Sequence, residues 1–394
     1  MPDDWDFMQQ ALDLARATSA LASPNPQVGC LLVRDGEVLG RGAHLYSNRD
    51  HAEIVALKQA AARGHSTHGA TAYVTLEPCS HHGRTGPCAD ALIAAGITRA
   101  VIAMEDPNPA VSGRGTAKLR AADLEVDLGI CQGEARELND AFAHFIRARR
   151  PFVTLKAALS ADGKLAPPPA LRVPGQPHWI TGPAARQEVQ LLRHRSDAIL
   201  TGIGTVLADD PQLTDRSNIS GPGGLARRRP LLRVVLDTHL RTPLDSKLVR
   251  SAHIAQRPEG DGEQSSDLLI LCGADARPSS IAALQQHGAD VRMLPLQAGR
   301  LSLSATLDLL ARRNCISLLL EAGSHLNGAF LNQQLVDRVV LFYAPDRLGE
   351  LGLPFAQGLA SPHLLEQRLT RPTRDNLPPD TVVAGYLHDP WLHH

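Results

Sequence analysis

The stretch from His51 to Cys88 constrains this chain more than any other, because it sets three metal-binding side chains in a fixed order. His51 is followed by Glu53, and Cys79 and Cys88 come after the pair Glu77-Pro78. Imidazole nitrogen and thiolate sulfur both suit zinc. Three protein ligands leave the fourth tetrahedral position open, which is typical of a catalytic zinc rather than a structural one. A fold for this chain must therefore bring these three side chains together.

The same residues indicate a chemistry. A His-x-Glu sequence followed by Pro-Cys and a second cysteine is the signature of the zinc deaminases, in which the glutamate carries protons. Glu53 holds that position here. A single histidine or cysteine is more often an ordinary surface or core residue, but the order of all four favours metal binding. We therefore expect a hydrolytic deaminase.

The segments around these residues predict how they can meet. Residues 54–61 are an apolar run of helical character, and residues 72–76 have the composition of a buried strand. Cys88 opens a second helical run that Gly96 stops. Two helix N-termini and a strand end can then converge on one metal, and the helix dipoles favour ionised thiolates.

The spacing of the cysteines departs from the general signature. Eight residues, 80–87, separate Cys79 from Cys88, where two are usual. The insertion is polar and rich in glycine, so we expect a loop at the mouth of the site.

Length and composition limit the function classes. The 394 residues allow two to three domains, and a hydrophobic content of 43% is ordinary for a globular protein. A net charge of −1 gives no sign of a nucleic-acid or membrane-surface partner. No apolar run reaches the roughly 18 residues of a membrane-spanning helix, and the acidic N-terminus is unlike a signal peptide. The six cysteines are too sparse for a disulfide framework. We therefore expect a cytoplasmic protein.

Strands alternate with helices in both halves of the chain, which predicts α/β layers. In the first half we expect helices over 6–22 and 134–147, a hairpin over 28–40, and strands over 100–104 and 124–128. The charged run 147–150 separates a domain over 1–147 from one over 151–394.

The second half predicts a helix over 182–193 and irregular segments over 165–177, 217–229 and 258–266. Strands are expected over 152–158, 198–202, 232–237, 268–272, 291–294, 316–321 and 339–344. Gly202 and Gly204 do not complete a Rossmann fingerprint. Spacing alone leaves this half unidentified, although backbone amides over 321–324, at a strand end before a helix, suit a phosphate.

The whole chain resembles the bifunctional deaminase/reductase family of riboflavin biosynthesis from about residue 5 to 345. The first half carries the resemblance in residues 24–29, 51–53, 77–88 and 106–109, and the second in 160–164, 179–181, 197–202, 209–214 and 321–323. The long cysteine spacing makes it specific. The resemblance implies zinc-dependent deamination of a phosphoribosylamino-diaminopyrimidinone, followed by NADPH-dependent reduction of its ribose to ribitol.

The resemblance also assigns residues in a domain of cytidine-deaminase type. It implies that His51, Cys79 and Cys88 bind one Zn²⁺ and that Glu53 is catalytic. The substrate contacts that it implies are Asn25, His44, His82 and Arg84.

In the second half the resemblance implies a dihydrofolate-reductase-like domain. Its implied NADPH contacts are Ala158, Trp179, Thr205, Asp209, Thr238, Gly323, Ser324, His325 and Leu326. Its implied substrate contacts are Arg193, Leu213, Arg216 and Glu321. Family members are typically oligomeric, so the same resemblance implies a homo-oligomer. Residues 165–177 are longer than the family's usual link, and Pro177 stands where a serine normally touches the substrate.

Three other hypotheses share parts of this pattern. A nucleic-acid base deaminase predicts a two-residue cysteine spacing and a basic groove, neither of which the sequence has. A deaminase with an impaired or purely structural reductase half is favoured by the altered link before Trp179. A non-catalytic zinc-binding interaction protein needs a fourth ligand, which His81 or His82 would supply.

Overall fold

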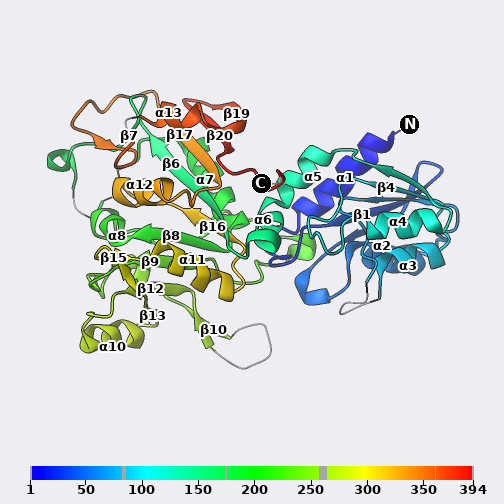
Figure 1. The fold of residues 1–394 in the computed structure, drawn as a ribbon, viewed down its shortest axis with the longest axis horizontal. Helices are drawn as coiled ribbons and strands as arrows, with labels where there is room; N and C mark the ends of the chain where they lie inside the picture. Colours follow the sequence, from blue (N-terminus) through cyan, green and yellow to red (C-terminus); the bar gives the residue numbers. More distant parts are fainter. Residues whose placement is uncertain are drawn as a thin grey trace. The chain divides into compact units, whose positions relative to one another are not determined.

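A computed structural model of the chain describes residues 2–81, 86–173, 175–176, 178–256, 264–359 and 361–392 (Figure 1). The described chain forms two compact units. The first comprises residues 2–149 together with Ile219–Arg228, and the second comprises Arg150–Asn218 and Arg229–Leu392. A short segment of the second half of the sequence thus belongs structurally to the first unit. No helix in the described parts of the chain is long and apolar enough to cross a membrane.

The first unit is built on a five-stranded sheet with the order β2-β1-β3-β4-β5. β1 runs antiparallel to β2 and β3, and β3, β4 and β5 are parallel. Its strands are β1 (Gly29–Arg34), β2 (Glu37–Ala43), β3 (Thr71–Val74), β4 (Arg99–Ile102) and β5 (Glu125–Leu128). Its helices are α1 (Asp4–Arg16), η1 (Tyr46–Asn48), α2 (Ala52–Ala62), α3 (Cys88–Ala94), α4 (Arg114–Ala121), α5 (Gln132–Leu138), α6 (Asp140–Ala148) and η3 (Pro222–Gly224).

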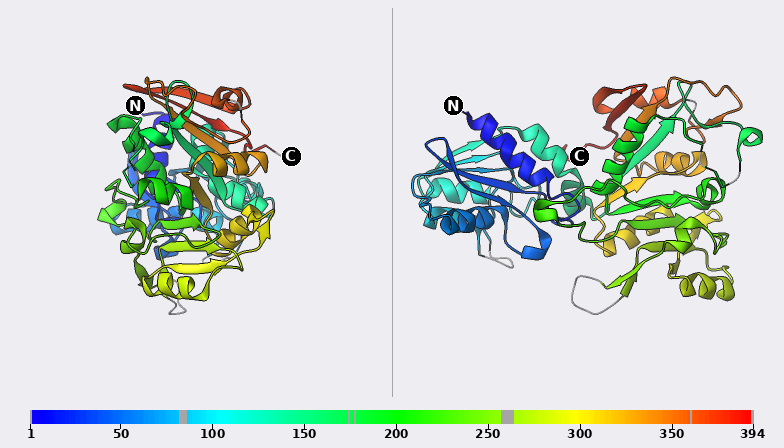
Figure 2. Two further views of the ribbon diagram at one scale, coloured as in Figure 1. Left: turned by 90° about the vertical axis from the view of Figure 1, so that its left-hand side faces the viewer. Right: turned by 180° about the vertical axis from the view of Figure 1, so that it is seen from behind.

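Glycines let helices pack closely on both faces of this sheet (Figure 2). A Cβ on Gly29 would lie 1.9 Å from the Ala11 carbonyl oxygen in α1. A Cβ on Gly42 would lie 1.9 Å from the Ala52 carbonyl oxygen in α2. Gly42 pairs with Cys30, the neighbour of Gly29, so the two glycines face opposite sides of the sheet. α1 and α2 therefore cover opposite faces, and the unit has three layers.

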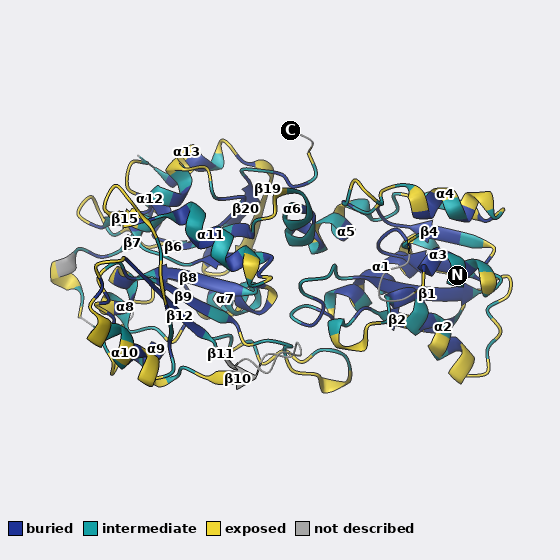
Figure 3. Cartoon of the chain, turned by 60° about the horizontal axis from the view of Figure 1, so that its bottom comes forward, coloured by how far each residue is buried: buried dark blue, intermediate teal, exposed yellow. Residues whose placement is uncertain are grey.

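The second unit is built on a nine-stranded sheet with the order β13-β12-β9-β8-β16-β6-β17-β20-β19. The strands from β13 to β17 in this order are parallel, and β17, β20 and β19 pair antiparallel. They are β6 (Phe152–Leu159), β8 (Ala198–Gly202), β9 (Leu232–Leu236), β12 (Leu268–Cys272), β13 (Asp290–Met293), β16 (Ser317–Leu320), β17 (Arg338–Tyr343), β19 (Thr370–Leu377) and β20 (Asp380–Tyr386). The central strands are buried (Figure 3), as expected for parallel strands covered on both faces.

Helices and short strand pairs surround this sheet. The helices are α7 (Pro183–Arg195), α8 (Ile203–Asp209), α9 (Lys247–Arg250), α10 (Pro278–Gln286), α11 (Leu303–Arg312), α12 (Ser324–Asn332) and α13 (Pro362–Glu366), with the short turn η2 (Pro169–Leu171). The strand pairs are β10 (Ile254–Gln256) with β11 (Gln264–Ser266), β14 (Leu296–Gln297) with β15 (Arg300–Leu301), and β7 (Lys164–Ala166) with β18 (Leu353–Pro354).

The strands and helices that the sequence predicted lie within about three residues of their expected bounds, but two helices differ. The segment 258–266, expected to be irregular, contains the short strand β11. The helix expected over 6–22 ends at Arg16, and Ala20 has a left-handed backbone with φ of 62°. The single helix expected over 134–147 is broken at Asn139, whose side chain donates to the Gln27 carbonyl and accepts from the Gln27 amide. The β19–β20 hairpin was not predicted, because the strand β19 is almost wholly exposed and lacks an apolar alternation.

Candidate active sites

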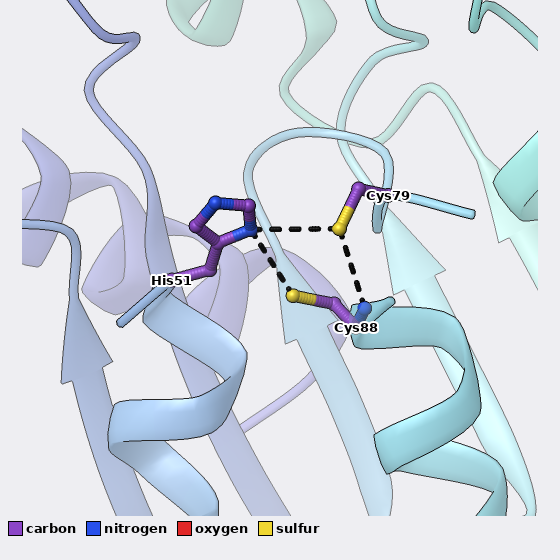
Figure 4. Close-up of side chains that lie close together, drawn as sticks. All are labelled: His51, Cys79 and Cys88. Carbon is purple, nitrogen blue, oxygen red and sulfur yellow. Dashed lines mark hydrogen bonds between the residues drawn. The ribbon is translucent and has the colours of Figure 1, made fainter. Parts of the chain in front are cut away.

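His51, Cys79 and Cys88 come together in the first unit, as the sequence predicted (Figure 4). The Nδ1 atom of His51 lies 3.2 Å from the Cys88 sulfur and 3.5 Å from the Cys79 sulfur. All three potential ligand atoms lie within 4.8 Å of one another. One imidazole and two thiols at this spacing form a donor set that fits zinc.

The ends of three elements position these ligands. His51 is the N-cap of α2, and the close contact of that helix with Gly42 fixes where it begins. Cys88 is the first residue of α3, so the positive end of the helix dipole faces its sulfur. Cys79 follows Pro78, whose carbonyl oxygen would lie 1.9 Å from a Cβ on Gly115. The segments that carry His51 and Cys79 thus pack closely against glycine backbone, and Cys88 is placed by the start of α3.

The cluster favours one thiolate even before a metal binds. Hydrogen bonds from the Cys88 side chain and from His51 outweigh burial and lower the pKa of the Cys79 thiol to about 4. The hydrogen bond to the Cys79 sulfur, together with burial, raises the pKa of the Cys88 thiol. A bound cation would favour ionisation of both sulfurs, since thiolates are the metal-binding form.

Glu53 lies in the first turn of α2, beside the cluster and 3% exposed. Burial raises its pKa to about 7, against weaker opposing effects from its own backbone amide and from His51. A carboxyl group with a pKa near neutrality can both accept and release a proton at working pH. The position predicted for the proton carrier is therefore occupied by a group suited to that task.

Asn25 and His44 also lie together in this unit. The side-chain amide of Asn25 is 2.9 Å from Nε2 of His44, and Nδ1 of His44 is 2.9 Å from the Asp50 carbonyl oxygen. The His44 ring stands edge-on to the His51 ring, with centroids 5.6 Å apart. Burial lowers the pKa of His44, which favours the neutral imidazole. These two predicted substrate contacts thus adjoin the metal ligands.

The other predicted residues of the inserted loop have different outcomes. His82 and Arg84 lie outside the described residues, so their expected substrate contacts stay predictions. His81 is exposed and is not part of the metal-ligand group found among the described residues. The described part of the chain therefore brings together three candidate ligands, which are His51, Cys79 and Cys88.

Two acidic residues near the cluster were given no role by the sequence analysis. Glu77 is buried, and its carboxylate accepts the backbone amides of Asp106, Gly113 and Thr116 over 2.9–3.1 Å. Asp106 has its pKa raised to about 6, chiefly by burial. Glu77 precedes the Pro-Cys pair and Asp106 directly precedes the turn Pro107-Asn108-Pro109, so only their positions within motifs could have indicated them.

The second unit contains a cavity of about 1840 Å³ at the carboxyl ends of its parallel strands. Four residues at these strand ends line the cavity: Ala158, the second-last residue of β6, Gly202 at the end of β8, Thr238 just after β9 and Glu321 just after β16. Ligands of open parallel α/β sheets bind at this edge. The cavity therefore lies where the topology predicts a binding site.

Every residue predicted for this half lies in the cavity wall. These are Ala158, Trp179, Thr205, Asp209, Thr238, Gly323, Ser324, His325 and Leu326 for the cofactor, and Arg193, Leu213, Arg216 and Glu321 for the substrate. Trp179 is 63% exposed there. Pro177 lies outside the described residues. Gly323 is the N-cap of α12, and no side chain caps that helix, so its first backbone amides open onto the cavity. That arrangement fits an anionic group such as the pyrophosphate of a nucleotide cofactor.

A buried charged group stands at one side of this cavity. Arg193 donates two hydrogen bonds to the Glu321 carboxylate, at 2.7 and 3.0 Å. Lys156, which the sequence analysis missed, places its ammonium 3.6 Å from the same carboxylate. Burial opposes ionisation of Glu321, but the two cations outweigh it and hold its pKa at about 2. Two basic side chains thus flank one carboxylate at this side of the cavity, and such basic groups suit a phosphorylated substrate.

Comparisons with known proteins identify both halves of the chain. Residues 1–104 match the family model described as the cytidine and deoxycytidylate deaminase zinc-binding region, and residues 151–376 match the RibD C-terminal domain. The riboflavin biosynthesis protein RibD of Escherichia coli is 41% identical over 89% of each chain. The chain belongs to the RibD family.

Solved structures give the same result for the fold. Acinetobacter baumannii RibD is 36% identical, with a TM-score of 0.75 over 97% of this chain and 98% of that one. A deaminase/reductase from Thermotoga maritima is 30% identical, with a TM-score of 0.76 over the same shares. The predicted family and fold class are therefore confirmed. As a member of this family, the chain is a bifunctional enzyme of riboflavin biosynthesis, with a deaminase unit and a reductase unit.

Proposed function

We propose that His51, Cys79 and Cys88 hold one catalytic Zn²⁺ and that Glu53 carries the proton in deamination of a phosphoribosylamino-diaminopyrimidinone. The convergence of three ligand atoms within 4.8 Å, beside a buried glutamate, carries this proposal. When bound, zinc would lower the pKa of a water molecule to about 7 and make it a nucleophile at neutral pH.

The chain's own residues then move the protons. Glu53 accepts a proton as the water oxygen bonds to the amine-bearing ring carbon, and it delivers that proton to the amine nitrogen. The carbon–nitrogen bond breaks and ammonia leaves. The second proton of the water passes to the adjacent ring nitrogen, so that a carbonyl remains on the ring. A pKa of about 7 lets Glu53 take both roles in one cycle.

Asn25 and His44 orient the pyrimidine in this proposal. Their mutual hydrogen bond fixes one amide and one imidazole next to the metal ligands, where both can meet the polar edge of the ring. His82 and Arg84 would complete the contacts of the substrate from the loop between the cysteines.

In the second unit we assign the nine cavity residues named above to NADPH and Arg193, Leu213, Arg216 and Glu321 to the deaminated product. When bound, NADPH would supply a hydride to C1 of the ribose, and a proton from solvent would complete its reduction to ribitol. Arg193 and Arg216 donate to the substrate, and the first backbone amides of α12 donate to the anionic part of the cofactor. Lys156, held between the cavity and Glu321, is an additional candidate for a substrate contact.

Assays on the purified full chain test the proposal. Ammonia should appear when the zinc-loaded protein receives the diaminopyrimidinone, and NADPH should be consumed when it receives the deaminated product. Ammonia release without NADPH consumption would favour the alternative of an active deaminase with an impaired or structural reductase unit. Because every residue predicted to contact the cofactor or the substrate lines the cavity, we favour an active reductase.

The remaining expectations belong to the same proposal. The two catalytic functions divide along the chain into residues 1–147 and 151–394. The protein acts in the cytoplasm as a homo-oligomer on small molecules, without a nucleic-acid or membrane partner. All six cysteines are free thiols, which supports a reducing compartment, and the oligomeric state follows from light scattering of the purified chain.

A further inference from the structure

The segment Ile219–Arg228 comes from the second half of the sequence but belongs to the first unit. It folds into a tight loop, because the Gly221 amide donates to the Leu225 carbonyl and the Gly224 amide donates to the Gly221 carbonyl. Gly221 lies so close to the end of α1 that a Cβ there would be 2.2 Å from Cδ1 of Leu21. The loop is therefore packed against the deaminase unit rather than projecting from it.

Arg228 makes three contacts at the end of this loop. Its backbone amide donates to the Ala20 carbonyl over 3.0 Å, and its guanidinium donates to the Ser23 carbonyl. The same guanidinium lies over the ring of Tyr46, 4.1 Å from the centroid. A planar guanidinium can donate in its plane and stack on an aromatic face at the same time. Arg228 therefore joins two separate segments of the deaminase unit.

Those two segments carry the predicted substrate contacts. Ser23 lies two residues before Asn25, and Tyr46 lies two residues after His44. Asn25 and His44 are themselves joined at 2.9 Å, and the Tyr46 amide donates to the Leu21 carbonyl. Arg228 thus links the backbone segment that carries Asn25 to the segment that carries His44, while the side chains of Asn25 and His44 contact each other directly.

We propose that Arg228 is a positioning residue for the deaminase site, holding Asn25 and His44 in register for the pyrimidine. The deaminase site is then completed by a segment that the reductase half of the sequence supplies. The inference rests on the proposed function, because it takes Asn25 and His44 as substrate contacts.

The test uses Arg228→Ala, Arg228→Lys and the charge-matched control Arg63→Ala in the full chain. Arg63 is exposed at the far end of α2 from His51. Arg228→Ala should raise the KM of deamination about tenfold, in line with the loss of one charged contact, with kcat within twofold. Zinc content and NADPH oxidation on the deaminated product should be unchanged. Arg228→Lys should have a KM of deamination between those of Arg228→Ala and the native chain. Arg63→Ala should have the KM and kcat of the native chain.

A double-variant comparison separates positioning from general support. If Arg228 acts through Asn25, then adding Arg228→Ala to Asn25→Ala should raise KM little further. A native KM in Arg228→Ala, a fully additive double variant, or a joint loss of kcat, zinc and reductase activity would each overturn the inference. If Arg228→Ala fails to fold, Tyr46→Leu replaces it in the test, because it removes the ring beneath the guanidinium. A native KM for Tyr46→Leu would also overturn the inference. Failure of the proposed function is recognised separately, since the native chain would then release no ammonia.

Discussion

Cys88 donates its backbone amide to the sulfur of Cys79 over 3.3 Å, although eight residues separate them in the sequence. The longer insertion therefore leaves the ligand geometry intact. Cys79 and Cys88, on either side of residues 80–87, are thus held in direct contact. The metal centre depends on the helix start at Cys88 and the strand-end segment at Cys79.

Removing one ligand should abolish zinc binding. We expect Cys79→Ser to lower the zinc content of the purified chain from about one per chain to nearly zero, because a serine hydroxyl is a poor substitute for a thiolate. Cys131→Ser is the matched control, since Cys131 lies outside the cluster and accepts a hydrogen bond from Gln9. Elemental analysis after dialysis checks both. Retention of full zinc by Cys79→Ser would contradict the ligand assignment.

The close packing of α2 makes Gly42 a sensitive position. We expect Gly42→Ala to destabilise the deaminase unit by roughly 2–3 kcal/mol or more, because the new Cβ meets the Ala52 carbonyl at 1.9 Å and displaces the helix that begins at His51. Zinc affinity should fall with it. Gly133→Ala, at a helical glycine with open space around it, should be neutral or stabilise by up to about 1 kcal/mol. Equal unfolding midpoints in urea for the two variants would contradict this account.

The charge on Glu321 should give the second unit a pH dependence. Its pKa in the folded chain, about 2, lies below its ordinary value of 4.5. The unfolded chain therefore binds the proton more readily, and the stabilisation is complete above about pH 4.5 and is lost as the pH falls towards 2. At pH 7 we expect Glu321→Gln to cost about 3 kcal/mol, because Arg193 and Lys156 lose their buried partner.

Urea unfolding at pH 7, 5 and 3 checks this expectation. The difference in unfolding free energy between the native chain and Glu321→Gln should shrink between pH 5 and pH 3. Glu350→Gln, at an exposed glutamate, should show no difference at any of these values. A constant difference for Glu321→Gln across the range would mean that its carboxylate is not held ionised by its neighbours.

Much of this molecule could be predicted from sequence because the deciding signals are local. The candidate zinc ligands lie at two helix starts and after a strand, each marked by composition. A buried parallel strand such as β12 is an uninterrupted apolar run. The break at Asn139 could not be predicted in the same way. It depends on the bonds of that side chain with Gln27, more than a hundred residues away in the sequence.

The roles of Lys156 and Arg228 were missed for a similar reason. Lys156 alternates with buried residues along β6 and reads as an ordinary strand position, and only the fold brings it to Glu321. Arg228 lies in an arginine-rich segment expected to be a surface loop, and its contact with Ser23 spans 205 positions. Long-range pairing of this kind leaves no periodic signal in a single sequence.

The most direct test of the bifunctional assignment is NADPH oxidation by the full chain when only the diaminopyrimidinone is supplied. The native protein should release ammonia and then oxidise NADPH after a lag, because the second reaction consumes the product of the first. Glu53→Gln should keep its zinc, lower deamination about 10²–10⁴-fold, and oxidise NADPH only when the deaminated product is added. Glu37→Gln, at an exposed position in the β1–β2 hairpin, should behave as the native chain. Undiminished ammonia release by Glu53→Gln, or no NADPH oxidation by the native chain with either compound, would contradict the account.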